Sequence, residues 1–169
     1  MGVRLSSVKP AKTPIFGDKM RLRKGLFMGV LRIKSTPMPI FFECQRCTAC
    51  CRWPGQVRVS DQEIGRLAES LGLTEAVFIQ QYTRLNNDRS GLALMDKPNG
   101  ECVFLRGSEC SVQAVKPQQC RDFPNLWRQP GYQDACKATP HEVSASEYRR
   151  LVASATGRTA AEIPVPDPK

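Results

Sequence analysis

The chain has 169 residues, a length that suits one domain with tails, and 41% of its residues are hydrophobic, which allows a core of modest size. It contains no run of about 18 or more apolar residues, so a membrane-spanning helix is excluded. The formal charge of +9 is concentrated in residues 1–42, which hold nine Lys or Arg residues and one acid. The rest of the chain is nearly neutral, so no basic face for nucleic acid is predicted there.

Residues 1–42 are predicted to form a flexible basic arm, because they mix Ser, Thr, Pro and Lys without a sustained hydrophobic period. A solvated tail is the simpler interpretation, and an anion-binding arm is the alternative. Aromatic residues do not alternate with the charges, so the base stacking typical of single-strand binding is not predicted. Nucleic-acid binding through the arm is therefore disfavoured but stays open, as does binding of a protein partner.

The first strong helix signal follows Ser60. A capping box of Ser60 and Glu63 starts a helix of about three turns. Apolar residues recur at i, i+3, i+4 and i+7 from Ile64, and Gly72 is suited to end the helix. Thr74 then caps a second short helix.

A polar loop is expected next, over residues 86–91. Two short strands are expected at 92–95 and 102–105, joined by a turn at 96–100 in which Asn-Gly favours a hairpin. A second turn at 106–109 leads to a stretch with little period, which is predicted to be loop and short helix held by metal ligation.

A second capping box, at Ser144 and Glu147, predicts a last amphipathic helix that ends at Gly157. From residue 163 the chain is expected to be extended and disordered. The predicted fold class is α+β, a small metal-stapled domain with short helices, one β-hairpin and much irregular loop. Its expected parts are a basic arm over residues 1–42, a cysteine-cluster metal-binding domain over 43–140, and a C-terminal helix with a tail over 141–169.

The unusual feature of the chain is its eight cysteines, which all lie between residues 44 and 136. Cysteines at this density indicate either a disulfide scaffold or a metal domain. The N-terminal residues lack an apolar segment followed by a cleavage site, so we expect a reducing cytoplasm, where thiols stay free to bind metal. The expected metal ligands are Cys44, Cys47, Cys50, Cys51, Cys102, Cys110, Cys120 and Cys136.

The first four cysteines have an informative spacing. Two residues separate Cys44 from Cys47 and Cys47 from Cys50, and such a unit lets a tight loop bring its sulfurs to one metal. Cys51 follows Cys50 directly, and adjacent side chains diverge. The Cys50–Cys51 pair is therefore expected to supply two metals, or one ligand and one free thiol. The sequence does not decide how eight ligands divide between two sites.

The scarcity of histidine limits the choice of metal. With one histidine in the chain, any four-ligand site must be rich in thiolates, which select zinc, Cu(I) or iron–sulfur over magnesium or calcium. His141 is interpreted as a surface residue, because no second histidine stands at ligand spacing. Arg121 and Arg128 are candidates to neutralise the thiolates; the alternatives are solvated arginines or ion pairs with Asp122 and Asp134.

Three hypotheses for function follow. In the first, the ions are structural, because residues 106–140 have little core of their own. In the second, Cys44, Cys47, Cys50 and one distant cysteine hold a [4Fe–4S] cluster with redox chemistry. In the third, a zinc-stabilised module binds nucleic acid or protein. No nucleophile–base set, HExxH motif or Gly-rich phosphate loop is present, so catalysis would have to come from the metal.

The acidic residues of the two predicted helices are interpreted as a solvated face rather than as an acid–base pair. They are Asp61, Glu63, Glu69 and Glu75.

The ordered cysteines also resemble a known family. The residues that carry the resemblance are Cys44-x2-Cys47-x2-Cys50-Cys51, Cys102-Val103-Phe104-Leu105, Cys110, Lys116-Pro117-x2-Cys120-Arg121-Asp122-Phe123-Pro124 and Cys136. Over about residues 41–137 they resemble the zinc- or iron-chelating cysteine-cluster family, also called YkgJ-like or CxxCxxCC. The resemblance implies a bacterial cytoplasmic protein that chelates zinc or iron. Flagellin lysine methylases resemble the family in this motif, which makes a [4Fe–4S] centre with methyl-transfer chemistry an alternative.

The chain departs from the family pattern at two places. Val112-Gln113 stands where members usually carry Ile-Tyr, and Lys116 stands where they carry Arg. No role is therefore carried over for that tyrosine or arginine.

Overall fold

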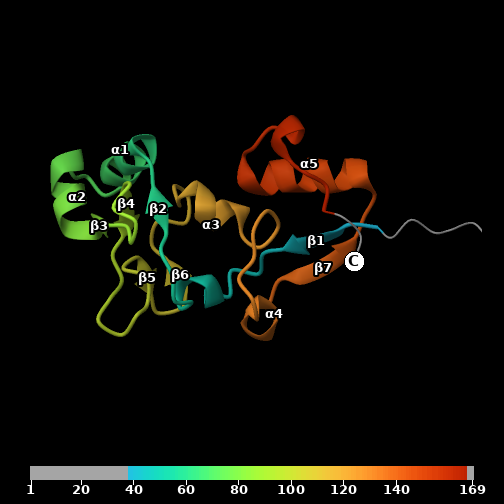
Figure 1. Cartoon of the computed structure of the whole chain (residues 1–169), viewed down its shortest axis with the longest axis horizontal. Coiled ribbons are helices and arrows are strands. Elements are labelled where there is room, and N and C mark those ends of the chain that lie inside the picture. The colour runs from blue at the N-terminus through green and yellow to red at the C-terminus, as the bar shows by residue number, and fades with distance from the viewer. Residues whose placement is uncertain (1–37, 167–169) are drawn as a thin grey trace, which may run out of the picture. The chain divides into compact units, whose positions relative to one another are not determined.

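The computed structural model describes residues 38–166 (Figure 1). The predicted arm over residues 1–42 therefore lies almost entirely outside the described residues. Within residues 38–166, no helix is long and apolar enough to cross a membrane. The elements in chain order are β1 (Ile40–Glu43), η1 (Ala49–Cys51), β2 (Arg58–Val59), α1 (Asp61–Ser70), α2 (Glu75–Tyr82), β3 (Thr83–Leu85), β4 (Leu92–Leu94), β5 (Leu105–Arg106), β6 (Glu109–Cys110), α3 (Gln118–Asp122), α4 (Tyr132–Ala135), β7 (Thr139–Glu142), α5 (Ala145–Thr156) and η2 (Ala160–Glu162).

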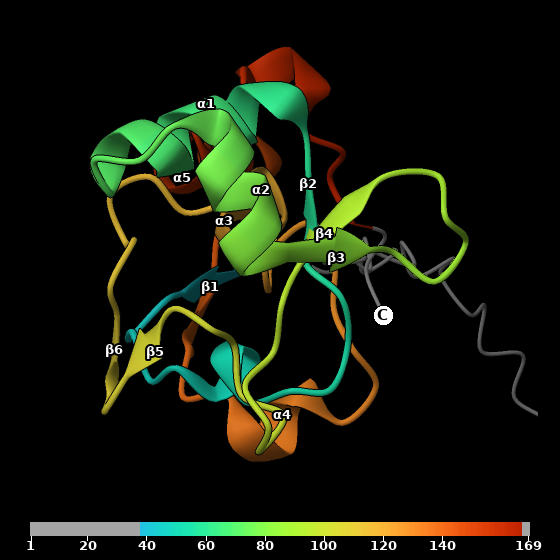
Figure 2. The ribbon, with the colours of Figure 1, turned by 90° about the vertical axis from the view of Figure 1, so that its left-hand side faces the viewer.

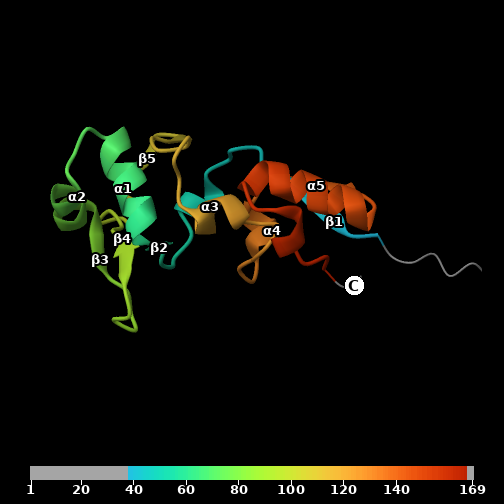
Figure 3. The ribbon, with the colours of Figure 1, turned by 90° about the horizontal axis from the view of Figure 1, so that it is seen from above.

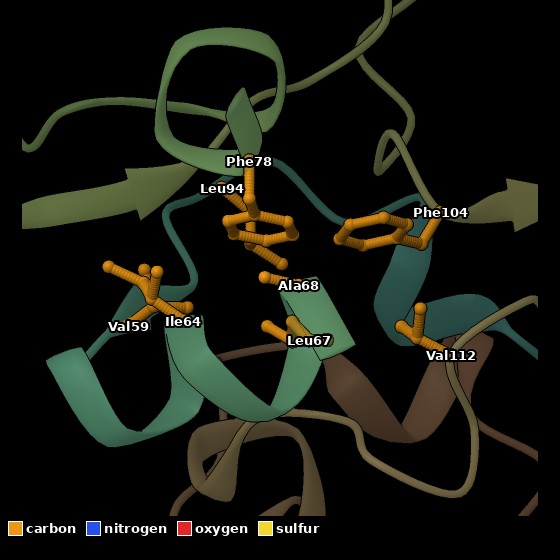
Figure 4. Packing of buried hydrophobic residues seen from close by; sticks show 8 residues of the cluster. All are labelled: Val59, Ile64, Leu67, Ala68, Phe78, Leu94, Phe104 and Val112. Carbon is orange, nitrogen blue, oxygen red and sulfur yellow. The ribbon is translucent and has the colours of Figure 1, made fainter. Parts of the chain in front are cut away.

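The two helices α1 and α2 begin where their caps predict. Ser60 accepts a hydrogen bond from the backbone N–H of Glu63, and the Glu63 carboxylate accepts one from the N–H of Ser60. The hydroxyl of Thr74 caps α2 by accepting a hydrogen bond from the backbone N–H of Val77. Both helices pack their apolar faces into one core, shown in Figure 4. This first core consists of Val59, Ile64, Leu67, Ala68, Phe78, Leu94, Phe104 and Val112.

The strand pairing differs from the predicted hairpin of residues 92–95 with 102–105. Strand β4 lies at the centre of an antiparallel sheet of order β2–β4–β3, so both of its edges are already paired. Residues 102–105 therefore cannot join it as a strand, and Cys102 makes only an isolated bridge with Asp96. The predicted loop at 86–91 connects β3 to β4. A tight hairpin forms instead between β5 and β6, where Gly107 has the positive φ of 58° that its turn requires.

A second core lies beside the antiparallel pair of β1 and β7. Ser144 caps α5, and Gly157 ends it in a left-handed conformation, as predicted. Tyr148 and Val152 of α5 are fully buried against Phe41 and Ile163. Ile163 falls in the segment expected to be disordered, yet only 2% of its surface is exposed, because η2 turns the chain back along α5.

Helix α3 connects the two cores, and Figures 1 and 3 show it between α1 and α5, while Figure 2 shows α1 and α2 nearest the viewer. The backbone N–H of Gln118 donates to Glu63 of α1 at 2.6 Å, while its side-chain amide donates to the carbonyl of Thr156 at 3.1 Å. Short helices and small antiparallel strands thus make up the mixed α+β fold that the sequence predicts.

Candidate metal centre

All eight cysteines line one cavity of about 270 Å³. Each carries a free thiol. The fold thus brings the sequence-distant group of Cys102, Cys110, Cys120 and Cys136 to the same cavity as the Cys44–Cys51 loop. The structure places the predicted residues together, and their role as metal ligands stays a prediction.

The Cys44–Cys51 loop is shaped by two residues with unusual backbone angles. Arg46 has φ of 52° and Thr48 has φ of 58°, both in the left-handed region that non-glycine residues rarely adopt. Thr48 precedes η1, and its carbonyl accepts a hydrogen bond from the N–H of Cys51 at 2.9 Å. Its hydroxyl also accepts one from the Arg52 guanidinium. Such strain concentrates at functional sites, and here it turns the loop so that cysteines along its length face the cavity.

Of the other four cysteines, two lie within short elements, one directly follows a short helix and one lies in a loop. Cys102 is held against the loop, since its backbone N–H donates to the carbonyl of Cys51 at 2.7 Å. Cys110 ends β6, Cys120 lies within α3, and Cys136 follows α4 directly. None of these elements exceeds five residues, so each cysteine depends on tertiary packing for its position.

The thiols surround the cavity rather than converge on one point. Within residues 38–166, no three His, Cys, Asp or Glu side chains are gathered closely enough to hold an ion as they stand. The cavity exceeds the roughly 30 Å³ that one water occupies, so it has room for metal and for the side-chain rotations that ligation requires. The remaining wall is mainly apolar and includes Val57, Leu94, Phe104, Val112 and Phe123.

Three of the thiols that line the cavity, Cys50, Cys51 and Cys110, interact with one another. Interaction with Cys51 lowers the pKa of Cys50 to about 7 and that of Cys110 to about 6, and the positive charge of Lys116 acts in the same direction on both. The same interactions, with Cys110 first, raise the pKa of Cys51. Burial raises the pKa of Cys120. Cys50 and Cys110 are therefore the most readily ionised of these four thiols, and the thiolate is the form of cysteine that binds metal.

Cys47 and Cys136 form a separate pair. The backbone N–H of Lys137 donates to the Cys47 sulfur at 3.4 Å. Burial opposes ionisation of Cys47, but the amides of Lys137 and Ala49 together with the Cys136 thiol outweigh it and lower the pKa of Cys47. Burial, with the nearby Cys47, raises the pKa of Cys136.

The cations at the cavity are not the ones that the sequence indicated. Arg46 and Lys116 line the cavity with the cysteines. Lys116 precedes a buried proline, Pro117, in the segment that leads to Cys120, and this proximity to a cysteine was the signal available in the sequence. A cation in the wall offsets the repulsion between neighbouring thiolates.

The proposed roles of Arg121 and Arg128 need correction. Arg121 donates to the carbonyls of Lys116 and Ala114, and Arg128 lies over the Phe42 ring at 4.7 Å. Both side chains are thus engaged by carbonyls or aromatic rings instead of thiolates. Asp122 pairs with Arg158, and no ion pair within residues 38–166 involves Asp134.

His141 lies on the surface, as interpreted from the sequence. It is exposed on β7, its ring nitrogen is 3.2 Å from the carboxylate of Glu43, and it stacks on Phe41.

Glu63 contradicts the prediction of a solvated acidic face. Asp61, Glu69 and Glu75 are exposed, but Glu63 is 8% exposed. Burial raises the pKa of Glu63, but hydrogen bonds from the N–H groups of Gln118 and Ser60 outweigh this effect and lower it overall. Its carboxylate therefore joins α1 to α3.

Comparison with known proteins bears on the whole cysteine region. The family profile CxxCxxCC, described as "Putative zinc- or iron-chelating domain", matches residues 43–150. The match spans more than half of the chain and includes all eight cysteines. No curated protein and no solved structure gives a match.

Proposed function

We propose that this chain, which belongs to the CxxCxxCC family of zinc- or iron-chelating domains, binds its metal through the eight cysteines of the cavity and depends on that metal for stability. The observation that carries the proposal is that every cysteine of the chain lines the same cavity, although the residues span positions 44 to 136. Such a thiolate-rich set suits zinc or iron.

The local structure around the cavity supports a stabilising role for the metal. Strands β5 and β6 have two residues each, and α3 and α4 have five and four. Elements this short do not form stably on their own. A metal bound by cysteines from several of them adds its binding free energy to the folding free energy of the domain.

The bound metal determines what further chemistry is available. Zinc would act as a crosslink without redox activity, whereas an iron–sulfur cluster would supply electron transfer. Either requires free thiols, so we place the protein in a reducing compartment, the bacterial cytoplasm.

A [4Fe–4S] cluster on Cys44, Cys47, Cys50 and one distant cysteine is the second candidate function, with redox or methyl-transfer chemistry. It is favoured by the C-x2-C-x2-C spacing on one loop and by a cavity larger than a single ion needs. Iron with acid-labile sulfide, and a brown colour in protein purified without oxygen, would support this candidate.

The third candidate, nucleic-acid binding through the basic arm, concerns residues outside the described structure. RNA binding by the full chain and by a chain that lacks residues 1–37 would be compared across salt concentrations. Unchanged binding would remove the arm from consideration.

The experiment for the main proposal is thermal unfolding of the metal-loaded protein with and without a strong chelator under reducing conditions. We expect the chelator to lower the melting temperature and to release zinc or iron in proportion. Complete loss of metal with an unchanged melting temperature would contradict a stabilising role.

A further inference from the structure

We propose that the eight cysteines form two separate metal sites, an outer site and an inner site. The outer site consists of Cys44, Cys47 and Cys136. The inner site is drawn from Cys50, Cys51, Cys102, Cys110 and Cys120. The inference rests on the proposed function, because it divides ligands whose metal binding is itself proposed.

The outer group is assembled by the pairing of β1 with β7. The last pair of that ladder is Glu43 with Thr139. Cys44 follows Glu43 directly and Cys136 precedes Thr139 by three residues, so both lie just beyond the same end of the ladder. Cys47 is held there because its sulfur accepts the hydrogen bond from the backbone N–H of Lys137.

Two cysteines of the inner group are attached to the first hydrophobic core instead. Cys102 and Cys110 pack against that core, whereas none of the outer three cysteines does. Cys102 is joined to Cys51 by the backbone hydrogen bond of 2.7 Å, and the N–H of Leu105, the strand partner of Cys110, donates to the carbonyl of Cys102 at 3.0 Å. These contacts connect Cys51, Cys102 and Cys110 to one another independently of the β1–β7 ladder.

A second, smaller cavity of about 50 Å³ is lined by part of the inner group. Its lining contains Cys50, Cys51 and Cys102 and no cysteine of the outer group. Three of the five inner cysteines therefore border both cavities, whereas Cys110, Cys120 and the three outer cysteines border only the larger one. The division also places the adjacent Cys50 and Cys51 in one group and assigns the C-x2-C unit of Cys44 and Cys47 to the other.

The two sites differ in what they can do. A tetrahedral metal held by three thiolates keeps one coordination position for water or an exchangeable ligand, as catalytic zinc sites do. Cys44 of the outer group is exposed, as is Cys50 of the inner group, so the number of available thiols distinguishes the two sites. The inner group has enough thiols for a closed, four-ligand structural site. We therefore assign exchange and ligand binding to the outer site and fold stabilisation to the inner one.

Paired substitutions in the full chain test this division, with metal content and melting temperature as readouts. We expect C44S/C136S to lose the outer metal, to retain the inner metal and to melt within a few degrees of wild type. The matched variant C102S/C120S should lose the inner metal and melt far lower. Loss of all metal in C44S/C136S would overturn the proposal, as would wild-type protein with one ion or one cluster per chain.

A measurement on wild-type protein keeps the test valid if C102S/C120S does not fold. A limiting amount of chelator is added, and newly exposed thiols are alkylated and located by mass spectrometry. We expect Cys44, Cys47 and Cys136 to become alkylated together while the ligands of the inner site stay protected. Alkylation of all eight in one phase would overturn the division.

The open position is tested with imidazole on cobalt-substituted protein. We expect imidazole to change the visible absorption of the wild type but not that of C44S/C136S. An unchanged wild-type spectrum would argue against an exchangeable ligand position. Failure of the proposed function is distinguishable from all of these outcomes, because wild-type protein would then contain no zinc or iron.

Discussion

The guanidinium of Arg158 donates two hydrogen bonds to the carboxylate of Asp122, at 2.9 and 2.6 Å. Arg158 follows the end of α5, and Asp122 is the last residue of α3. The first residue of α3, Gln118, also donates its backbone N–H to the carboxylate of Glu63 in α1. The two cores are therefore joined through the helix that carries Cys120. Interactions remote from the thiols are therefore expected to govern the geometry of the cavity.

The Arg158–Asp122 pair gives the first prediction. Arg158→Ala leaves a carboxylate that is 7% exposed without its charged partner. We expect a loss of about 2–3 kcal/mol in the free energy of unfolding, at the lower end for a buried pair because Arg158 itself is partly exposed. Denaturant unfolding of the metal-loaded protein measures it. Arg150→Ala, which breaks the exposed pair with Glu147, is the control and should leave the free energy of unfolding nearly unchanged.

The buried Glu63 carboxylate gives a prediction about pH. Its pKa is lowered in the folded state, so its contribution is fully present above the unfolded-state pKa and is lost as pH falls toward the lower folded-state value. Glu63→Gln should therefore destabilise the protein at neutral pH and weaken the decline of stability in acid. Unfolding free energies measured from pH 7 to pH 3 test this. Glu69→Gln, on the exposed face of the same helix, should leave the pH profile unchanged, and equal profiles for both variants would refute the assignment.

The aromatic side chain of Phe104 links the first core to the cavity wall. It is 2% exposed, lies 5.3 Å from the ring of Tyr82 and lines the cavity beside Cys102. Phe104→Ala should cost about 3–5 kcal/mol through lost burial and the void left behind. We expect a lower melting temperature and reduced metal content. Met95→Ala, at a side chain 37% exposed, should change stability by about 0.5 kcal/mol or less.

The thiol of Cys47 gives a direct test of ligation. Cys47→Ser should lower both metal content and soluble yield, because the hydroxyl replaces a thiolate ligand. Ser108→Ala alters the same cavity without removing a thiol and should retain the metal of the wild type. Elemental analysis of both purified variants makes the comparison. A Cys47→Ser protein with full metal and normal melting would count against Cys47 as a ligand.

The helix caps were predictable from the sequence because they depend on local chemistry. Ser60, Thr74 and Ser144 all cap helices through bonds to residues three positions later. The pairing of β4 was not predictable in the same way, since β4 pairs with a strand, β2, that lies more than thirty residues earlier. Burial of Ile163 also depends on a tertiary contact, here with α5, and leaves no local pattern.

In the candidate site, too, local features could be predicted from the sequence and tertiary ones could not. The cysteines were identifiable as a set by their number and spacing, yet their grouping depends on which strands pair and which core each loop contacts. Arg46 and Lys116 are the cations that line the cavity, whereas Arg121 and Arg128, the candidates that the sequence offers, do not line it. Sequence proximity did not distinguish side chains that face the thiols from those that bind backbone carbonyls.

The most direct test of metal binding by the cysteine cavity is elemental and acid-labile sulfide analysis, with a visible spectrum, of full-length protein purified without oxygen. The account predicts zinc or iron bound to each chain, with few thiols open to alkylation until a chelator is added. Colourless zinc protein would favour the structural role, and brown protein with sulfide would favour the cluster. Folded protein without either metal, in which all eight thiols react at once, would contradict the account.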